Sequence, residues 1–133
     1  MSNLRKPFLT CALLLLLCSC EINGSIVETV NYGNYFLVNH SSYDLTVDAG
    51  DRDLLTDTVP AGQTVHFFDM VEGTGGHVFP SNAFNEFRLL ATLNGAETVV
   101  YSGVNNDDWE EAGYTEENHA IIRLTVTDAF LGL

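Results

Sequence analysis

The sequence predicts an all-β domain, an antiparallel sandwich or small barrel of about seven strands. Apolar and polar residues alternate with a period of two over most of the chain after residue 34, and turn-forming residues separate the alternating segments at short intervals. No segment shows a convincing helical period. The pattern therefore offers none of the crossover helices that a parallel α/β sheet requires.

The expected strands follow one another along the chain. The segment NYFLVNH at residues 34–40 is apolar on both faces, which is typical of a central strand. YDLTVDA at residues 43–49 alternates, and it predicts a strand with one face in water. Further strands are expected over residues 54–59, 63–70, 86–93, 96–103 and 119–130.

Two connections can be interpreted from their residues. Asn94-Gly95 joins two of the expected strands and is the favoured pair for a type I′ turn, in which both central residues need a positive φ. Residues 107–117 are the one place where a short helix is expected, with Asp108 as its cap and acidic residues in its first turn.

The N-terminus has the pattern of an export signal. Arg5 and Lys6 precede an apolar run from Phe8 to Leu17, which is about ten residues, whereas a membrane-spanning helix needs roughly 20. A short basic region followed by an apolar region of this length is typical of a signal peptide. The alternative, a buried helix, lacks a polar face and a cap.

The end of this run resembles the lipobox of bacterial lipoproteins. Leu17-Cys18-Ser19-Cys20 provides an aliphatic residue, a tolerant position, a small residue and a cysteine. The resemblance implies that residues 1–19 are removed as a signal peptide and that Cys20, the new first residue, carries a diacylglycerol on its sulfur and an acyl chain on its amino group. Three acyl chains anchor a protein firmly to a membrane without a spanning helix.

This processing would leave a strongly acidic chain. Cys11 and Cys18 would depart with the signal, so the domain would contain no free thiol, disulfide or cysteine metal site. Its three arginines and eighteen acidic residues would give a formal charge of −15. Such a surface is repelled by phosphate backbones, which excludes nucleic acid as a partner. The acidity is interpreted first as a means of solubility, with divalent cations or a basic partner as the alternative.

The pattern after Cys20 resembles the small uncharacterised envelope lipoproteins of Bacteroidota. It is carried by the YFLVN strand, the VPAGQTV turn, the Asn-Gly hairpin, the NNDDW loop and the final IIRLTVTD strand. The resemblance implies an antiparallel immunoglobulin-like sandwich in the cell envelope, with the outer membrane as its expected location. We expect a lipidated tether with a possible first strand over residues 20–33 and the sandwich over residues 34–133.

The sequence contains no recognisable catalytic motif. The four histidines have no zinc spacing, and no serine lies in a G-x-S-x-G turn. Oxygen ligands of the kind that Ca²⁺ prefers occur in two acidic stretches, which makes weak candidates of Asp48, Asp51, Asp53, Asp107 and Asp108. Neither stretch has the spacing of an EF-hand, and both are interpreted as solvated turns. No cofactor is expected.

Trp109, the only tryptophan, allows two interpretations. Among the acidic residues of NNDDWEE, an exposed indole would be a platform for a ligand such as a sugar. A single large aromatic residue in a small sandwich more often fills one end of the core, and we predict this buried position.

The functional hypothesis is a lipid-anchored envelope protein with a non-enzymatic binding or structural role. The alternative is a small glycan-binding or glycan-hydrolysing protein that uses paired acidic residues. A third hypothesis is a subunit or inhibitor that docks on another envelope protein. An enzyme of this size needs a concave site with acidic groups of perturbed pKa, whereas a docking module should present a flat edge or an apolar patch.

The lipobox leads to a direct prediction. The membrane form of the protein should have the mass of a chain that starts at Cys20 plus its acyl groups. Cys20→Ala should accumulate as uncleaved or mislocalised precursor, because both the lipid acceptor and the cleavage signal are lost. Normally processed and acylated Cys20→Ala protein in the membrane fraction would contradict the assignment.

Overall fold

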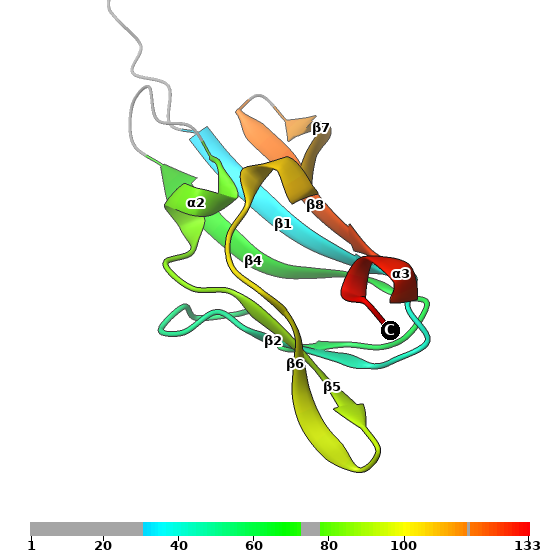
Figure 1. The fold of residues 1–133 in the computed structure, drawn as a ribbon. Helices are drawn as coiled ribbons and strands as arrows, with labels where there is room; N and C mark the ends of the chain where they lie inside the picture. Colours follow the sequence, from blue (N-terminus) through cyan, green and yellow to red (C-terminus); the bar gives the residue numbers. More distant parts are fainter. Residues whose placement is uncertain (1–30, 73–77, 117) are drawn as a thin grey trace, which may run out of the picture.

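The structure, a computed structural model, describes residues 31–72, 78–116 and 118–133, which form a β-sandwich of two four-stranded sheets (Figure 1). The strand order of the first sheet is β4 (Thr64–Glu72), β1 (Asn31–Asn39), β8 (His119–Val126), β7 (Trp109–Glu116). The order of the second sheet is β3 (Thr58–Val59), β2 (Leu45–Asp48), β5 (Arg88–Leu93), β6 (Ala96–Ser102). The predicted fold class is confirmed, with eight strands in place of about seven.

β1 lies inside the first sheet, between β4 and β8, as its two apolar faces predict. It runs antiparallel to β4 but parallel to β8, from Tyr32 opposite His119 to Asn39 opposite Val126. This pair departs from the antiparallel pattern of the other described pairs. Turn residues in a sequence predict the pairing of strands that follow one another along the chain. They could not predict the pairing of β1 with β8, because no turn joins these two strands.

The helix expected over residues 107–117 is wrong. A short 3-10 turn, η1 (Asn106–Asp108), is followed directly by β7. The side chain of Asn105, and not that of Asp108, caps the turn by accepting from the backbone N–H of Asp107. Pairing with the edge of β8 and burial of Trp109 outweigh the local helical signal, since tertiary contacts override weak propensities.

Other boundaries also shift. β1 begins at Asn31, before the expected domain boundary at residue 34, and the possible first strand in the tether lies outside the described residues. Only Thr58–Val59 is a strand within the expected range 54–59. β8 ends at Val126, and residues 128–131 form the short helix α3 (Asp128–Leu131), which the side chain of Thr127 caps.

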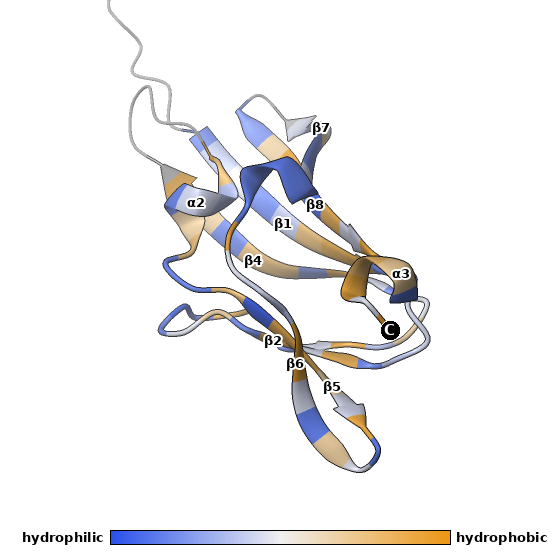
Figure 2. Ribbon diagram, viewed as in Figure 1, coloured by the Kyte–Doolittle hydropathy of each residue, from blue (hydrophilic) through white to orange (hydrophobic). Residues whose placement is uncertain are grey.

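The core lies between the inner faces of the two sheets, and Figure 2 shows the alternation of apolar and polar residues along their strands. Its side chains are aliphatic along most of the sandwich and aromatic toward α2 (Pro80–Ala83). The largest fully buried side chains are Tyr35, Phe67, Phe84, Phe87, Leu37, Leu45, Leu89 and Leu124. Burial of each such side chain contributes about 1.5–3 kcal/mol.

A buried polar side chain fixes the point where the chain leaves the first sheet. The amide nitrogen of Asn39 donates to the carbonyl oxygens of Tyr43 and Val59 at 2.8 and 2.9 Å. Its oxygen accepts from the backbone N–H and the hydroxyl of Ser41 at 3.0 and 2.6 Å. Asn39 is fully buried, and these bonds satisfy both its donors and its acceptor, as burial of a polar group requires.

The hairpin between β5 and β6 is confirmed. Leu93 pairs with Ala96, and the two residues between them have positive φ, 51° at Asn94 and 80° at Gly95. A Cβ atom on Gly95 would meet no atom within 4 Å, so the backbone conformation alone selects glycine.

Gly95→Val should therefore lower the free energy of unfolding by about 1–2 kcal/mol, because a β-branched residue resists positive φ. Gly95→Asn is the matched control, with a smaller loss, because asparagine tolerates the left-handed region. Equilibrium denaturation in urea measures both changes. An unchanged stability of Gly95→Val would show that the turn is wrongly placed.

Candidate functional site

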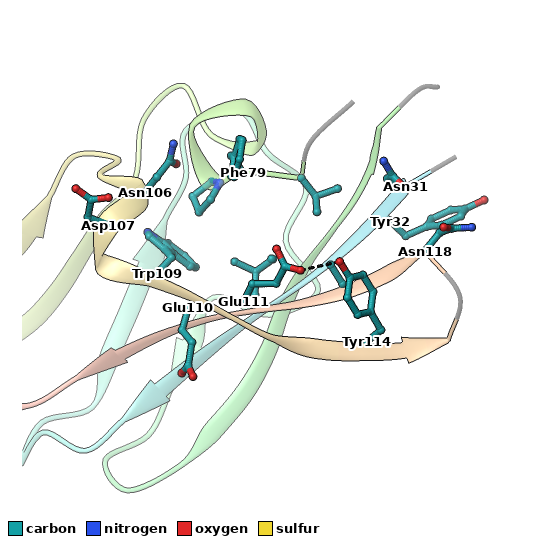
Figure 3. A pocket seen from close by; sticks show the side chains of 14 residues that line it. Asn31, Tyr32, Phe79, Asn106, Asp107, Trp109, Glu110, Glu111, Tyr114 and Asn118 are labelled. Atoms are coloured by element: carbon teal, nitrogen blue, oxygen red, sulfur yellow. Dashed lines mark hydrogen bonds between the residues drawn. The ribbon is translucent and has the colours of Figure 1, made fainter. Parts of the chain in front are cut away.

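A cleft with a volume of about 300 Å³ opens at one end of the sandwich (Figure 3). The inner face of the first sheet forms part of its lining, through residues that β1, β7 and β8 carry. The segment Val78–Pro80 before α2 and the turn η1 form the rest. The cleft is therefore assembled from five segments that the fold brings to the same end of the sandwich.

Hydrogen bonds hold the segment Val78–Pro80 and α2 in place. The hydroxyl of Tyr35, whose ring is fully buried, donates to the carbonyl oxygen of Val78 at 2.6 Å. Asn106 of η1 accepts from the backbone N–H of Ser81 and donates to its hydroxyl, both at 2.9 Å. These bonds join the segment to the core on one side and to η1 on the other.

Trp109 lies beneath the cleft as the predicted core residue. Its side chain is 9 % exposed, and its ring packs on Phe84 and Phe87 with centroid separations of 6.0 and 5.3 Å. Tyr35 and Phe67 also contact it, at 5.9 and 6.3 Å. The burial of Trp109 is confirmed, although the residue also contributes to the lining of the cleft. Its Nε1 is buried and has no hydrogen-bond partner among the described residues.

Alternation along β7 turns the side chains of the adjacent Glu110 and Glu111 to opposite faces of the sheet, and a bulge follows them. The register with β8 shifts between Glu111 and Gly113, and the glycine has a φ of 119° that other residues rarely adopt. The side chain of Glu110 accepts from Arg123 at 3.1 Å. It points in the direction opposite to that of Glu111, although Glu110 is one of the residues that line the cleft (Figure 3). Glu111 instead points toward Tyr114.

The hydroxyl of Tyr114 donates to the carboxylate of Glu111 at 2.7 Å. This hydrogen bond and the negative charge of Glu111 raise the pKa of the Tyr114 phenol above its ordinary value. The pair places one carboxylate and one exposed aromatic ring at the same wall of the cleft.

The two adjacent glutamates of β7 do not form the facing pair that glycoside hydrolysis requires. Glu110 and Glu111 point in opposite directions and do not face each other across the cleft (Figure 3). A general acid also needs a raised carboxyl pKa. Among the described residues, Asp48 and Asp128 have a lowered carboxyl pKa, caused first by a backbone hydrogen bond from Gly50 and by the Ser42 hydroxyl respectively.

The weak Ca²⁺ candidates are not brought together. Asp48 forms an ion pair with Arg88, and Asp51 and Asp53 lie exposed beyond it. Asp107 lies in η1 beside Asp108, which accepts a hydrogen bond from Tyr101 at 2.8 Å. Within the described ranges, no three histidine, cysteine or acidic side chains are grouped to hold a metal ion.

The described histidines make other contacts. His66 pairs with Asp69 at 2.5 Å and stacks on Phe36, and His119 stacks on Tyr32 with a centroid separation of 4.3 Å. His40 is exposed, and His77 lies outside the described residues.

Comparison of the chain with protein-family models, with curated proteins and with solved structures gives no match. Cys20 lies outside the described residues. In the part of the chain that the structure describes, no helix has the length and apolar character to cross a bilayer.

Sequence reasoning identified Trp109 and its acidic neighbourhood but missed Phe79, Glu111 and Tyr114 as one site. Phe79 lies about thirty residues from the others in sequence, and only the hydrogen bonds of Val78 and Ser81 bring it to η1 and β7. The available signal was Phe79-Pro80 within a glycine-rich stretch, since loops of this kind often carry binding residues.

Proposed function

We propose that this protein is a lipid-anchored component of the bacterial cell envelope whose sandwich serves as a non-enzymatic binding module. The cleft beside Trp109 is its proposed ligand site, and the lipid on Cys20 is its proposed membrane anchor. The observation that carries the binding role is a concave site whose walls are fixed by the fold itself.

The fixed walls favour binding. Tyr35 and Asn106 hold the segment before α2 through hydrogen bonds that need no ligand. A site that is already ordered loses less conformational entropy when a ligand enters, which increases affinity. Most small-molecule sites in proteins are concave and largely formed in advance in the same way.

The position of the cleft fits the proposed anchor. Asn31, the first described residue, lines the cleft, so the chain enters the fold beside it. Residues 20–30 would separate this point from the lipid, and a fully extended chain of that length reaches about 40 Å. The cleft would then lie at the end of the domain from which the tether leaves, within this distance of the bilayer surface. The membrane that the proposed lipid anchor enters is the outer membrane.

Glycan binding is the second candidate function. The ring of Phe79 lines the cleft and is 47 % exposed, and carboxylate and amide side chains lie around it. An exposed ring with nearby polar groups suits the apolar face and the hydroxyl groups of a sugar. Glycan hydrolysis finds less support, since the glutamates of β7 point in opposite directions.

Site-specific photo-crosslinking tests the binding role. A photoreactive p-benzoylphenylalanine in place of Phe79 should form a covalent adduct in native membranes, because it would line the occupied cleft. The same residue in place of Val99, which is also 47 % exposed but lies on β6, is the matched control.

Mass spectrometry of the full-length protein should show an adduct of defined mass at position 79 and none at position 99. Equal labelling at the two positions, or labelling at neither, would contradict a ligand site in the cleft.

A further inference from the structure

The cleft combines three properties that together define a class of ligand. It is concave, it exposes aromatic rings, and its ionisable groups are acidic. We propose that it holds an ammonium group carried on a short aliphatic stem. This inference rests on the proposed binding role and names the chemistry of the ligand.

The charged groups of the lining have one sign. Asp107, Glu110 and Glu111 contribute carboxylates, of which that of Glu110 is paired with Arg123. No lysine, arginine or histidine lines the cleft among the described residues. Arg88 is paired with Asp48. Neither Arg123 nor Arg88 lines the cleft. A carboxylate or phosphate ligand would find no counter-charge here, whereas a cation would find one.

The free acceptor capacity of the lining suits a ligand group that donates hydrogen bonds. The Tyr114 hydroxyl already donates to Glu111, and the Asn106 amide is bonded to Ser81 through both its oxygen and its nitrogen. A carboxylate accepts through two oxygens, so Glu111 retains acceptor capacity after its bond to Tyr114. An ammonium group has three donors and no acceptor, which matches acceptors of this kind. The buried Nε1 of Trp109, a donor without a partner among the described residues, would be available to another part of the ligand.

The aromatic rings add a second attraction for a cation. The Tyr114 side chain is 63 % exposed and lies against the Glu111 carboxylate, and Phe79 is 47 % exposed at another wall. The face of an aromatic ring attracts a cation within about 6 Å of its centroid. Ala120 and Ile122 on β8 also line the cleft, where their exposures of 3 % and 4 % leave a small apolar area for the aliphatic stem.

The charge of the whole domain acts in the same direction. If the chain is processed before Cys20, its formal charge of −15 attracts cations and repels anions over distances comparable to the Debye length. Binding should therefore weaken as the salt concentration rises.

The test uses the full-length lipidated protein in a non-ionic detergent, since choline headgroups would compete for the cleft. The first probe is lysine blocked at both its amino and its carboxyl end, and blocked norleucine, which lacks only the amine, is its matched partner. n-Butylammonium represents a free amine with the same stem, and N-acetylglucosamine represents a neutral sugar. Backbone amide shifts in NMR spectra report binding at Glu111, Tyr114 and Asn118.

We expect blocked lysine to shift these resonances with saturation and blocked norleucine to leave them unchanged. Glu111→Gln should weaken the binding of lysine by about threefold to tenfold, since it removes one charge from a partly exposed contact. Glu97→Gln, which removes the same charge from β6 outside the cleft, should change the affinity by less than about twofold. A native circular-dichroism spectrum of both variants verifies that they are folded.

The outcomes separate this inference from the proposed function. Equal affinity for butylammonium and blocked lysine identifies a small free amine, and tighter binding of blocked lysine identifies a side chain of a protein. Saturable binding of the sugar without lysine binding would overturn the ammonium proposal and retain the cleft as a ligand site. Equal shifts with norleucine, no shift with any amine, or equal effects of the two glutamine substitutions would also overturn it.

Discussion

The packing of the two sheets and of the segment around α2 depends on the aromatic cluster that closes one end of the core. Phe84 and Phe87 follow α2, Trp109 begins β7, and Tyr35 and Phe67 come from β1 and β4. Their rings lie 5.3 to 6.3 Å from that of Trp109, so they connect the two sheets with the segment that crosses between them. Aromatic pairs at such distances contribute about 0.5–1.5 kcal/mol beyond the burial of their area.

The cleft is a consequence of this closure. Trp109 and its neighbours fill the space between the sheets, and beyond them β7 carries Glu111 and Tyr114 on a sheet that no second sheet covers in the described structure. The fully buried ring of Tyr35 places its hydroxyl at the carbonyl of Val78. The same aromatic side chain thus stabilises the core and positions the segment that includes Phe79. Binding in the proposed cleft would rest on the aromatic end of the core.

The sequence predicted those features that depend on local patterns. Alternation identified the all-β class and the central place of β1, and Asn94-Gly95 identified the hairpin, because side-chain period and positive φ are properties of neighbouring residues. The parallel pairing of β1 with β8 was beyond this reasoning, since no turn joins the two strands. The prediction of a helix over residues 107–117 was wrong because pairing with β8 and burial of Trp109 determine the conformation of that segment.

The site was predicted only in part for the same reason. The burial of Trp109 followed from the size of an indole relative to a small core. The opposite directions of Glu110 and Glu111, however, follow from the strand that replaces the expected helix. The place of Phe79 depends on hydrogen bonds made by Val78 and Ser81. A pattern of acidic residues alone could not distinguish a pair of facing carboxylates from two that point apart.

Fluorescence of Trp109 tests the central claim most directly, because it is the only tryptophan in the chain. In the folded full-length protein, the account predicts blue-shifted emission and strong protection from quenching by iodide. Both properties should be lost together when the protein unfolds in denaturant, which supplies the exposed reference from the same molecule. Emission close to that of free tryptophan, with easy quenching by iodide in the folded state, would contradict the account, since Trp109 could not then close the core.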